Sequence, residues 1–321
     1  MARIFLTGAT GFVGGSVLAA LLDAGHSVRA LVRSPAAAGR LAAQGVDTII
    51  GDILEPCRVD GVDAVVHLAA MVDPALFGDA RELDAVNRDA AISLADRAQD
   101  AGVRTFVFLS SIAAVGFHDE VVTASTPCRP QTPYGRAKRD VEVALRARIS
   151  PTFCPVILRP PTIIGPGERY NFLGWVRATS RGIFRPIGSG ENTFPLVSLT
   201  NVARAILASV DGSVPAGVHP LADPARYSVR RIYRAICSAL DVRPAQLNIP
   251  RPVADLIATL NDALVPLGVP QVLGRARVRT MTVDQPFDVG SLLAAGVPLV
   301  ACLEEQVRIT VEDQLRRGLV A

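Results

Sequence analysis

Short apolar runs alternate with longer alanine-rich stretches along the first half of the chain. The short runs are rich in β-branched residues and show little alternation of apolar and polar positions, as strands buried on both faces do. The expected strands are Arg3–Leu6, Ser27–Val32, Thr48–Ile50, Ala64–Leu68, Phe106–Leu109 and Pro155–Leu158. The stretches between them are expected to be helices, of which Arg81–Ala101 is the longest. The pattern therefore predicts an α/β fold, a Rossmann-like, doubly wound parallel sheet.

The pattern changes after about Pro160, where glycine and proline interrupt the chain repeatedly. We expect residues 1–160 to form the main domain and residues 161–321 to form a smaller, mainly substrate-binding region. Val197–Val210 has the pattern of a strand edge followed by a helix. Residues 196–211 are therefore expected to return to the main domain.

Composition narrows the class of protein. The 321 residues are 50% hydrophobic and 20% charged and include 26 glycines, as in a soluble globular protein. The net charge of +3 is small and the arginines are scattered, so nucleic acid is not expected as a partner. Five widely spaced cysteines give no metal-binding or redox pattern, which favours a reduced, cytoplasmic location and no bound metal.

Neither export nor membrane insertion is expected. The N-terminal residues reach a glycine-rich turn before any apolar stretch of signal-peptide length. The most apolar segment, Pro252–Gly274, is interrupted by Asp255 and Asp262, and two prolines within it would break a spanning helix. We expect packed helices of the substrate region there and no stable membrane insertion. The expected partner is a small-molecule substrate, and a homodimer is left open.

A glycine-rich turn follows the first expected strand and precedes a helix over Ser16–Ala24. Glycines at this spacing permit a tight turn, let the backbone approach a pyrophosphate and let helix and strand pack closely. The helix N-terminus adds free N–H groups and a favourable dipole for an anion. An ordinary βα turn is the alternative, but a second strand follows at the right distance. We therefore predict cofactor contacts from Thr7, Gly8, Thr10, Gly11, Phe12, Val13 and Gly14.

The end of the second strand bears on the choice of cofactor. An NAD-specific site would place an acidic residue there for the ribose 2′-hydroxyl. The chain has no carboxylate there, and Arg33 offers a positive fork suited to a 2′-phosphate. A solvated surface arginine is the alternative, and it is the favoured interpretation of Arg29. NADP(H) is therefore the expected cofactor, with NAD(H) as the alternative.

Tyr134 and Lys138 lie four residues apart on an expected helix and project from one face. A free tyrosine has a pKa near ~10, and a nearby ammonium lowers that pKa toward the range useful for proton exchange. Such a pair alone is common on protein surfaces. However, Ser110-Ser111 ends a buried strand at the sheet edge where open α/β folds bind ligands. We therefore predict that Ser111, Tyr134 and Lys138 are catalytic.

These motifs resemble the extended short-chain dehydrogenase/reductase family, also described as epimerase/dehydratases, closely over residues 3–165. The resemblance implies that Tyr134 is the acid/base, that Lys138 binds the nicotinamide ribose and tunes Tyr134, and that Ser111 polarises the reacting oxygen. It also implies cofactor contacts from Asp52, Ile53, Leu68, Ala69, Ala70, Asn87, Pro160 and Ile163.

Some of these positions have a second interpretation. Asp52 has the alternative of capping a turn, and His67 is expected to be a packed, hydrogen-bonded histidine instead of a catalyst. Ser110 competes with Ser111 for the catalytic role, because Ser110–Gly116 lacks the tyrosine that many relatives carry before that glycine.

The second half offers conflicting indications about the substrate. Gly165–Phe172 and Val197–Ala203 are similar to bacterial nucleotide-sugar 4-ketoreductases and epimerases. Asn171 and Arg185 are candidate substrate contacts there, with a helix cap as the alternative for Asn171. However, where many relatives present an arginine to the nucleotide diphosphate, this chain has Glu191–Phe194. An apolar ketone or aldehyde is the competing substrate class.

Three functions remain open from the sequence: an NADP(H)-dependent carbonyl reductase, a sugar-nucleotide epimerase/dehydratase and a non-catalytic dinucleotide sensor. Tyr134 and Lys138 argue against the sensor. An epimerase recycles its hydride internally and gains nothing from the NADPH pool, so Arg33 favours the reductase. Family resemblance alone does not decide the reaction.

Overall fold

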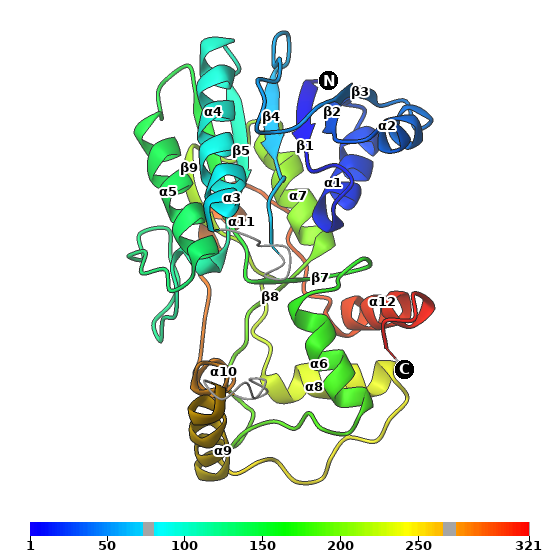
Figure 1. The fold of residues 1–321 in the computed structure, drawn as a ribbon, viewed down its shortest axis with the longest axis vertical. Helices are drawn as coiled ribbons and strands as arrows, with labels where there is room; N and C mark the ends of the chain where they lie inside the picture. The colour runs from blue at the N-terminus through cyan, green and yellow to red at the C-terminus, as the bar shows by residue number, and fades with distance from the viewer. Residues whose placement is uncertain (73–79, 266–273, 321) are drawn as a thin grey trace.

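The computed structural model describes residues 1–72, 80–265 and 274–320. Parallel strands form one seven-stranded sheet in the order β3-β2-β1-β4-β5-β6-β9 (Figure 1). The order reverses between β1 and β4, where open α/β sheets have their ligand-binding crevice. The predicted Rossmann-like fold is confirmed. The strands are β1 (Arg3–Thr7), β2 (Ser27–Val32), β3 (Asp47–Ile50), β4 (Ala64–His67), β5 (Thr105–Leu109), β6 (Cys154–Arg159) and β9 (Gly217–Pro220).

Both faces of this sheet are buried, and alternate residues of one strand serve different cores. Ile4 and Leu6 of β1 pack toward α1 (Phe12–Asp23), α2 (Pro35–Ala42) and α7 (Leu199–Val210). Phe5, between them, packs toward α4 (Ala90–Asp100) and α5 (Pro133–Ala147). A strand buried on both sides must be apolar on both, so central strands such as β5 appear in the sequence as apolar runs.

The helix predicted over Arg81–Ala101 is present but is not uniform. It begins with α3 (Ala80–Asp84), passes through a π-helical turn at Ala85–Asp89 and continues as α4. The buried Asn87 lies in that turn, and its amide exchanges two hydrogen bonds with the backbone of Met71, at 2.8 and 2.9 Å. The turn thus fixes the loop that follows β4, as π-turns at functional sites often do.

Strand β9 begins at Gly217, in the part of the chain that glycine and proline interrupt repeatedly. It pairs with β6 at the edge of the sheet, and Pro220 stands opposite Arg159. A proline cannot donate a hydrogen bond to a neighbouring strand, but an edge strand has one side that needs no donor. Pro220 is therefore compatible with this edge strand.

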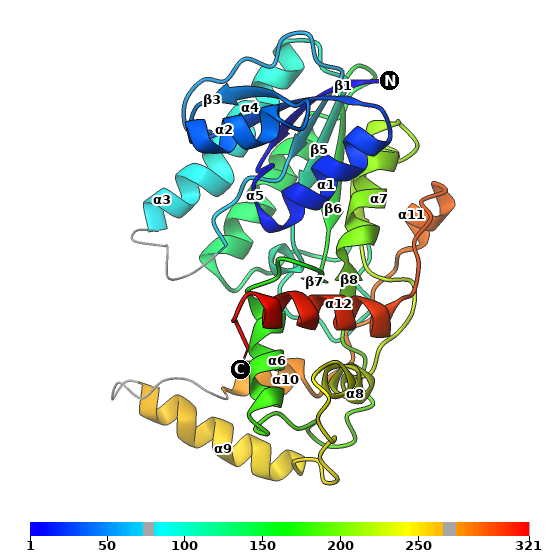
Figure 2. The same ribbon diagram turned by 90° about the vertical axis from the view of Figure 1, so that its right-hand side faces the viewer.

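The C-terminal region lies beyond the carboxyl ends of the main strands (Figure 2). Strands β7 (Thr162–Ile164) and β8 (Leu196–Ser198) form a separate parallel pair. Helices α6 (Asn171–Ser180), α8 (Val229–Ala239) and α12 (Leu303–Arg316) share one core with these strands. Helix α7 follows β8 directly but packs on α1 and the main sheet. Residues 161–321 therefore contribute to both parts of the molecule.

The remaining helices are α9 (Arg251–Leu264), α10 (Arg275–Thr280) and α11 (Gly290–Ala294), the last of which packs near β9. Helix α9 covers much of the segment for which packed helices were predicted, and residues 266–273 of that segment lie outside the described residues. It packs through Ala254 and Ala258, whereas Leu256 and Leu260 are 61% and 55% exposed. Packing thus holds for one face of α9 only. In the part of the chain that the structure describes, no helix is long and apolar enough to cross a membrane.

Candidate active site

The glycine turn between β1 and α1 has the form that a dinucleotide needs. Gly8 has φ +75°, and a Cβ there would lie 2.7 Å from the amide nitrogen of Ala69. A Cβ at Gly14 would lie 1.9 Å from the Gly8 carbonyl oxygen. Gly11 caps α1 without a side chain, which leaves the first amides of the helix open toward an anion. The residues therefore fit the pyrophosphate of a dinucleotide.

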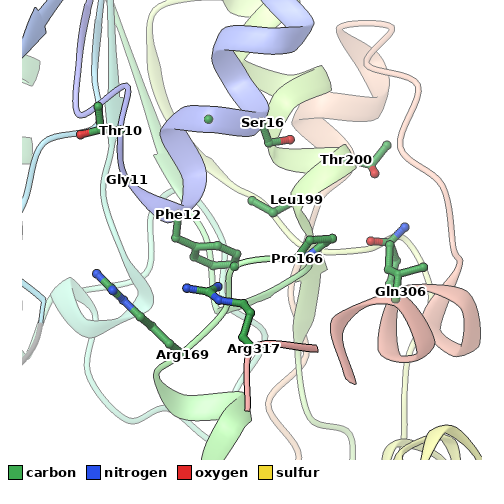
Figure 3. Close-up of a pocket in the computed structure, with 13 residues that line it drawn as sticks. Thr10, Gly11, Phe12, Ser16, Pro166, Arg169, Leu199, Thr200, Gln306 and Arg317 are labelled. Atoms are coloured by element: carbon green, nitrogen blue, oxygen red, sulfur yellow. The ribbon is translucent and has the colours of Figure 1, made fainter. Parts of the chain in front are cut away.

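A cavity of about 610 Å³ borders this turn on the side of α12 (Figure 3). Thr10, Gly11 and Phe12 form one wall, and α7 and α12 contribute to the others. Arg169, which follows β7, and Arg317, which follows α12, also line the cavity, and the Arg317 guanidinium lies beside Phe12. Arg169 offers the cavity a positive charge suited to phosphate, whereas Arg317 is paired with Asp313 at 3.4 Å. Sequence reasoning did not predict that Arg317 lies here, because nothing near it in the chain marks a cofactor site.

Arg33 lies exposed just beyond the end of β2. Within the described residues it has no ion pair or hydrogen bond to another side chain. Arg29, in contrast, binds Asp47 of β3 at 2.6 Å, as a surface arginine would. Arg33 is therefore the arginine of this strand whose charge is available to a ligand.

The loops after β3 and β4 border the same crevice. The Oδ1 of Asp52 accepts a hydrogen bond from the amide of Leu54 at 3.0 Å, so Asp52 does cap a turn. Ile53 packs against the core that contains Phe5. The loop of Leu68, Ala69 and Ala70 is held at its centre, where the Ala69 amide donates to Thr7 Oγ1 at 3.2 Å. These contacts fix the backbone of the loops beside the crevice.

His67 is buried beneath this loop. Its Nδ1 shares a hydrogen bond of 2.8 Å with Thr7 Oγ1, and its ring stacks on Phe108 with 5.9 Å between centroids. Burial, with a smaller effect of the nearby Lys138 charge, lowers the pKa of His67 to about 3. A neutral, packed histidine is what the sequence predicted for this position.

The structure brings Ser111, Tyr134 and Lys138 together where β5 ends and α5 begins. Thr132 caps α5 by accepting a hydrogen bond from the Gly135 amide at 3.0 Å. Ser111 is close enough to Tyr134 to lower its pKa, and Lys138 Nζ lies 5.7 Å from the Tyr134 ring centroid. Lys138 Nζ also donates to the Leu109 carbonyl at 2.8 Å. These side chains can therefore bind one oxygen and exchange its proton.

Burial shifts the pKa values of this pair in opposite directions. It raises the pKa of Tyr134 to about 12, although the nearby Ser111 lowers it, and it lowers the pKa of Lys138 to about 7. Both shifts favour the neutral forms, as desolvation does. Lys138 is also the only lysine in the sequence, among many arginines. A group that must bind and titrate in a buried site suits lysine and not arginine.

Comparison with known proteins decides the family. A model described as the NAD dependent epimerase/dehydratase family matches residues 4–217. The chain belongs to this family. The predicted resemblance is confirmed, and the protein is an NAD(P)-dependent enzyme of the short-chain dehydrogenase/reductase type.

Relatives within this family differ in their reactions. UDP-glucose 4-epimerase of Vibrio cholerae is 32% identical over 77% of this chain and 78% of the relative. Ceramide reductase of Caulobacter vibrioides is 28% identical over 92% of this chain and 89% of the relative. The solved enzyme WbmH of Bordetella bronchiseptica, in complex with NAD⁺, has a TM-score of 0.73 at 18% identity, covers 99% of both chains and shows the shared fold.

The geometry separates the two candidate serines of this epimerase/dehydratase-family site. Ser110 is buried and its hydroxyl donates to Glu142 Oε1 at 2.5 Å, which turns it away from Tyr134. Ser111 is half-buried, accepts a hydrogen bond from the Ala113 amide at 3.1 Å and also reaches Tyr134. The arrangement favours Ser111 as the serine of the trio.

The remaining predicted cofactor and substrate residues lie on β6, β7, α6 and the loop after α6. The Pro160 carbonyl accepts a hydrogen bond from the Ile112 amide at 2.9 Å, which holds the end of β6 beside the turn that contains Ser111. Ile163 of β7 packs against the core that contains Ile4 and Leu6. Asn171 begins α6 and is exposed, and Glu168 caps that helix in its place. Arg185 is exposed beside the Phe184–Tyr233 ring pair. The capping alternative for Asn171 is therefore wrong.

Sequence reasoning missed Glu142, which lies one helical turn after Lys138. Its carboxylate is buried against Arg159 at the end of β6. The spacing of four residues, continued from Tyr134 through Lys138, could have indicated that Glu142 shares their face. Its partner could not have been found, because it lies on another element.

Proposed function

We propose that this enzyme is an NADP(H)-dependent reductase that converts a ketone to a secondary alcohol. The observation that carries the proposal is Arg33, which stands without an acidic partner in the described residues where an NAD-specific site would have a carboxylate. A bound nicotinamide would supply the hydride. Tyr134 would donate the proton to the carbonyl oxygen, and Ser111 would hold that oxygen by a hydrogen bond.

The walls of the C-terminal region favour an apolar ketone as the substrate. Glu191, in the segment where many relatives present an arginine, is paired with Arg230 at 3.1 Å. Phe194 lies 4.8 Å from Trp175 between ring centroids, and Phe184 lies 5.0 Å from Trp175. These partly buried rings pack against the core of the C-terminal region, so this segment is mainly aromatic where a diphosphate would need charge. The similarity to a ceramide reductase supports the same substrate class.

A nucleotide sugar is the second candidate substrate. The similarity to a UDP-glucose 4-epimerase favours it, and Arg169 of the cavity beside the glycine turn offers a charge for a phosphate. In that case the enzyme would be a 4-ketoreductase, or an epimerase/dehydratase that retains its cofactor.

Ligand-induced stabilisation and turnover test the proposal together. The purified protein is analysed by mass spectrometry for retained cofactor, and its melting temperature is then measured with NADPH or NADH and with apolar ketones or UDP-glucose. We expect stabilisation by NADPH above NADH, and ketone-dependent oxidation of NADPH that is absent in Tyr134→Phe. Retained NAD⁺ together with conversion of UDP-glucose without net NADPH use would establish the epimerase instead.

A further inference from the structure

A buried ion pair lies directly behind the Tyr134–Lys138 pair. Arg159 of β6 and Glu142 of α5 are each 1% exposed, and Arg159 Nη2 lies 2.5 Å from Glu142 Oε2. Arg159 Nε also lies 3.0 Å from both carboxylate oxygens. A pair buried this completely is costly to desolvate and is not by itself evidence for stability. Its place beside the catalytic lysine suggests another reason for it.

The ion pair is connected to Lys138 by two routes. Along α5, Glu142 follows Lys138 by one turn, so their side chains lie on one face. Along β5, the Leu109 carbonyl accepts the hydrogen bond of Lys138, and the next residue, Ser110, donates to Glu142 at 2.5 Å. The backbone segment that holds Lys138 and the helix that carries it are therefore both connected to the Glu142 carboxylate.

We propose that Glu142 and Arg159 act as positioning residues, whose balance of charges keeps the buried Lys138 protonated and fixed against the end of β5. Through Lys138, the ion pair would set the pH range in which Tyr134 exchanges its proton. This inference rests on the proposed roles of Tyr134 and Lys138, but it concerns a property of the protein that is measurable without substrate.

The surroundings of Lys138 leave few other charges to do this. From β4, His67 is neutral near pH 7, because its pKa is lowered to about 3. From α5, Tyr134 is neutral, and from β5 the Phe108 ring lies 4.5 Å beneath the ammonium. From the loop before α5, Cys128 is a neutral thiol whose pKa burial raises, and it accepts a hydrogen bond from Arg159 at 3.2 Å.

The electrostatic effects have opposite signs for the two partners. Burial alone lowers the pKa of Lys138, and the Glu142 carboxylate raises it again. Removing the carboxylate would leave the Arg159 cation uncompensated, so the pKa of Lys138 should fall further. Removing Arg159 would leave Lys138 as the only cation paired with the Glu142 carboxylate, so the pKa of Lys138 should rise. A purely structural tie between α5 and β6 predicts no such opposition.

The single lysine makes the measurement direct. Because Lys138 is the only lysine, protein labelled with ¹³C at the lysine ε-carbon gives one NMR signal, which is followed against pH. We expect Glu142→Gln to shift its titration midpoint down and Arg159→Met to shift it up, each by at least about one pH unit, the size expected for a charge at this range. The double variant should return the midpoint toward the wild-type value.

One further variant and the double variant keep the test decisive. Cys128→Ala removes an uncharged neighbour of Arg159 and should leave the midpoint unchanged. If a single variant does not fold by circular dichroism, the double variant, which buries no uncompensated charge, still reports whether the pair matters for turnover and cofactor binding. Midpoints that do not move, or that move in the same direction in both single variants, would overturn the proposal. A failed reductase assay with the expected NMR shifts would overturn only the proposed function.

Discussion

Helices α5 and α9 are both amphipathic, but they use their apolar residues in opposite ways. Helix α5 of the sheet half buries Ala137, Val141 and Leu145 completely and carries Tyr134 and Lys138 into the site. Helix α9 of the C-terminal region buries only alanines and exposes leucines. The comparison shows that an amphipathic pattern alone does not determine how completely the apolar side of a helix is buried.

Among the variants considered, Lys138→Met should cause the largest loss of activity. It removes the charge beside Tyr134 and a predicted ribose contact, so turnover and NADPH affinity should fall together. The loss of turnover should exceed the ~10²- to 10⁴-fold expected for loss of an acid/base alone. Fluorescence titration with NADPH, beside a turnover assay, checks this. Arg136→Met, an exposed position on the same helix, is the matched control. Unchanged NADPH affinity would refute the ribose contact.

Tyr134→Phe should separate chemistry from binding within the same helix. Only the transferable proton is lost, so turnover should fall ~10²- to 10⁴-fold while NADPH affinity stays near the wild-type value. Steady-state kinetics on a validated substrate, with the same titration, measures both. A variant with the wild-type kcat would show that another group supplies the proton.

Much of the sheet half could be predicted from the sequence, for a physical reason. Strands buried on both faces must be apolar throughout, and tight turns against a sheet require glycine, so Ile4, Phe5, Leu6 and Gly14 could be assigned from local patterns. Sequence position also placed Ser111, Tyr134 and Lys138 at the same sheet edge, because the carboxyl ends of parallel strands meet there.

The parts that could not be predicted depend on contacts between distant elements. Glu142 and Arg159 are ordinary charged residues in the sequence, and only the packing of α5 on β6 makes them a buried pair. The cavity lined by Arg169 and Arg317 joins residues that are far apart in the chain. For α9, the apolar composition led us to expect a packed helix, although Leu256 and Leu260 are exposed. Local patterns state that a face is apolar and do not state what covers it.

A pair of leucine substitutions should sharpen the contrast in packing. Leu94 of α4 is fully buried, and Leu94→Ala should lower the free energy of unfolding by about 2–5 kcal/mol. Leu256→Ala on α9 should change it by less than about 0.5 kcal/mol, because the side chain is largely exposed. Urea denaturation of both variants gives the comparison. A similar loss of unfolding free energy in both variants would mean that the exposed leucines of α9 are covered in solution.

A smaller effect than that of Leu94→Ala is predicted for Arg33 and the choice of cofactor. A charge-assisted hydrogen bond contributes ~1.5 to 3 kcal/mol, and ~1.4 kcal/mol corresponds to tenfold in affinity. The wild-type enzyme should thus bind NADPH at least about tenfold more tightly than NADH, and the difference should narrow as salt screens the exposed charge. Arg33→Asp should erase or invert the preference, because it adds repulsion of the 2′-phosphate to the lost attraction.

Arg29→Asp is the matched control, since Arg29 already binds Asp47. Calorimetry with both cofactors measures the preference. Equal affinities in the wild type, or a preference that Arg33→Asp leaves unchanged, would assign Arg33 to the solvated surface and favour the NAD-retaining epimerase.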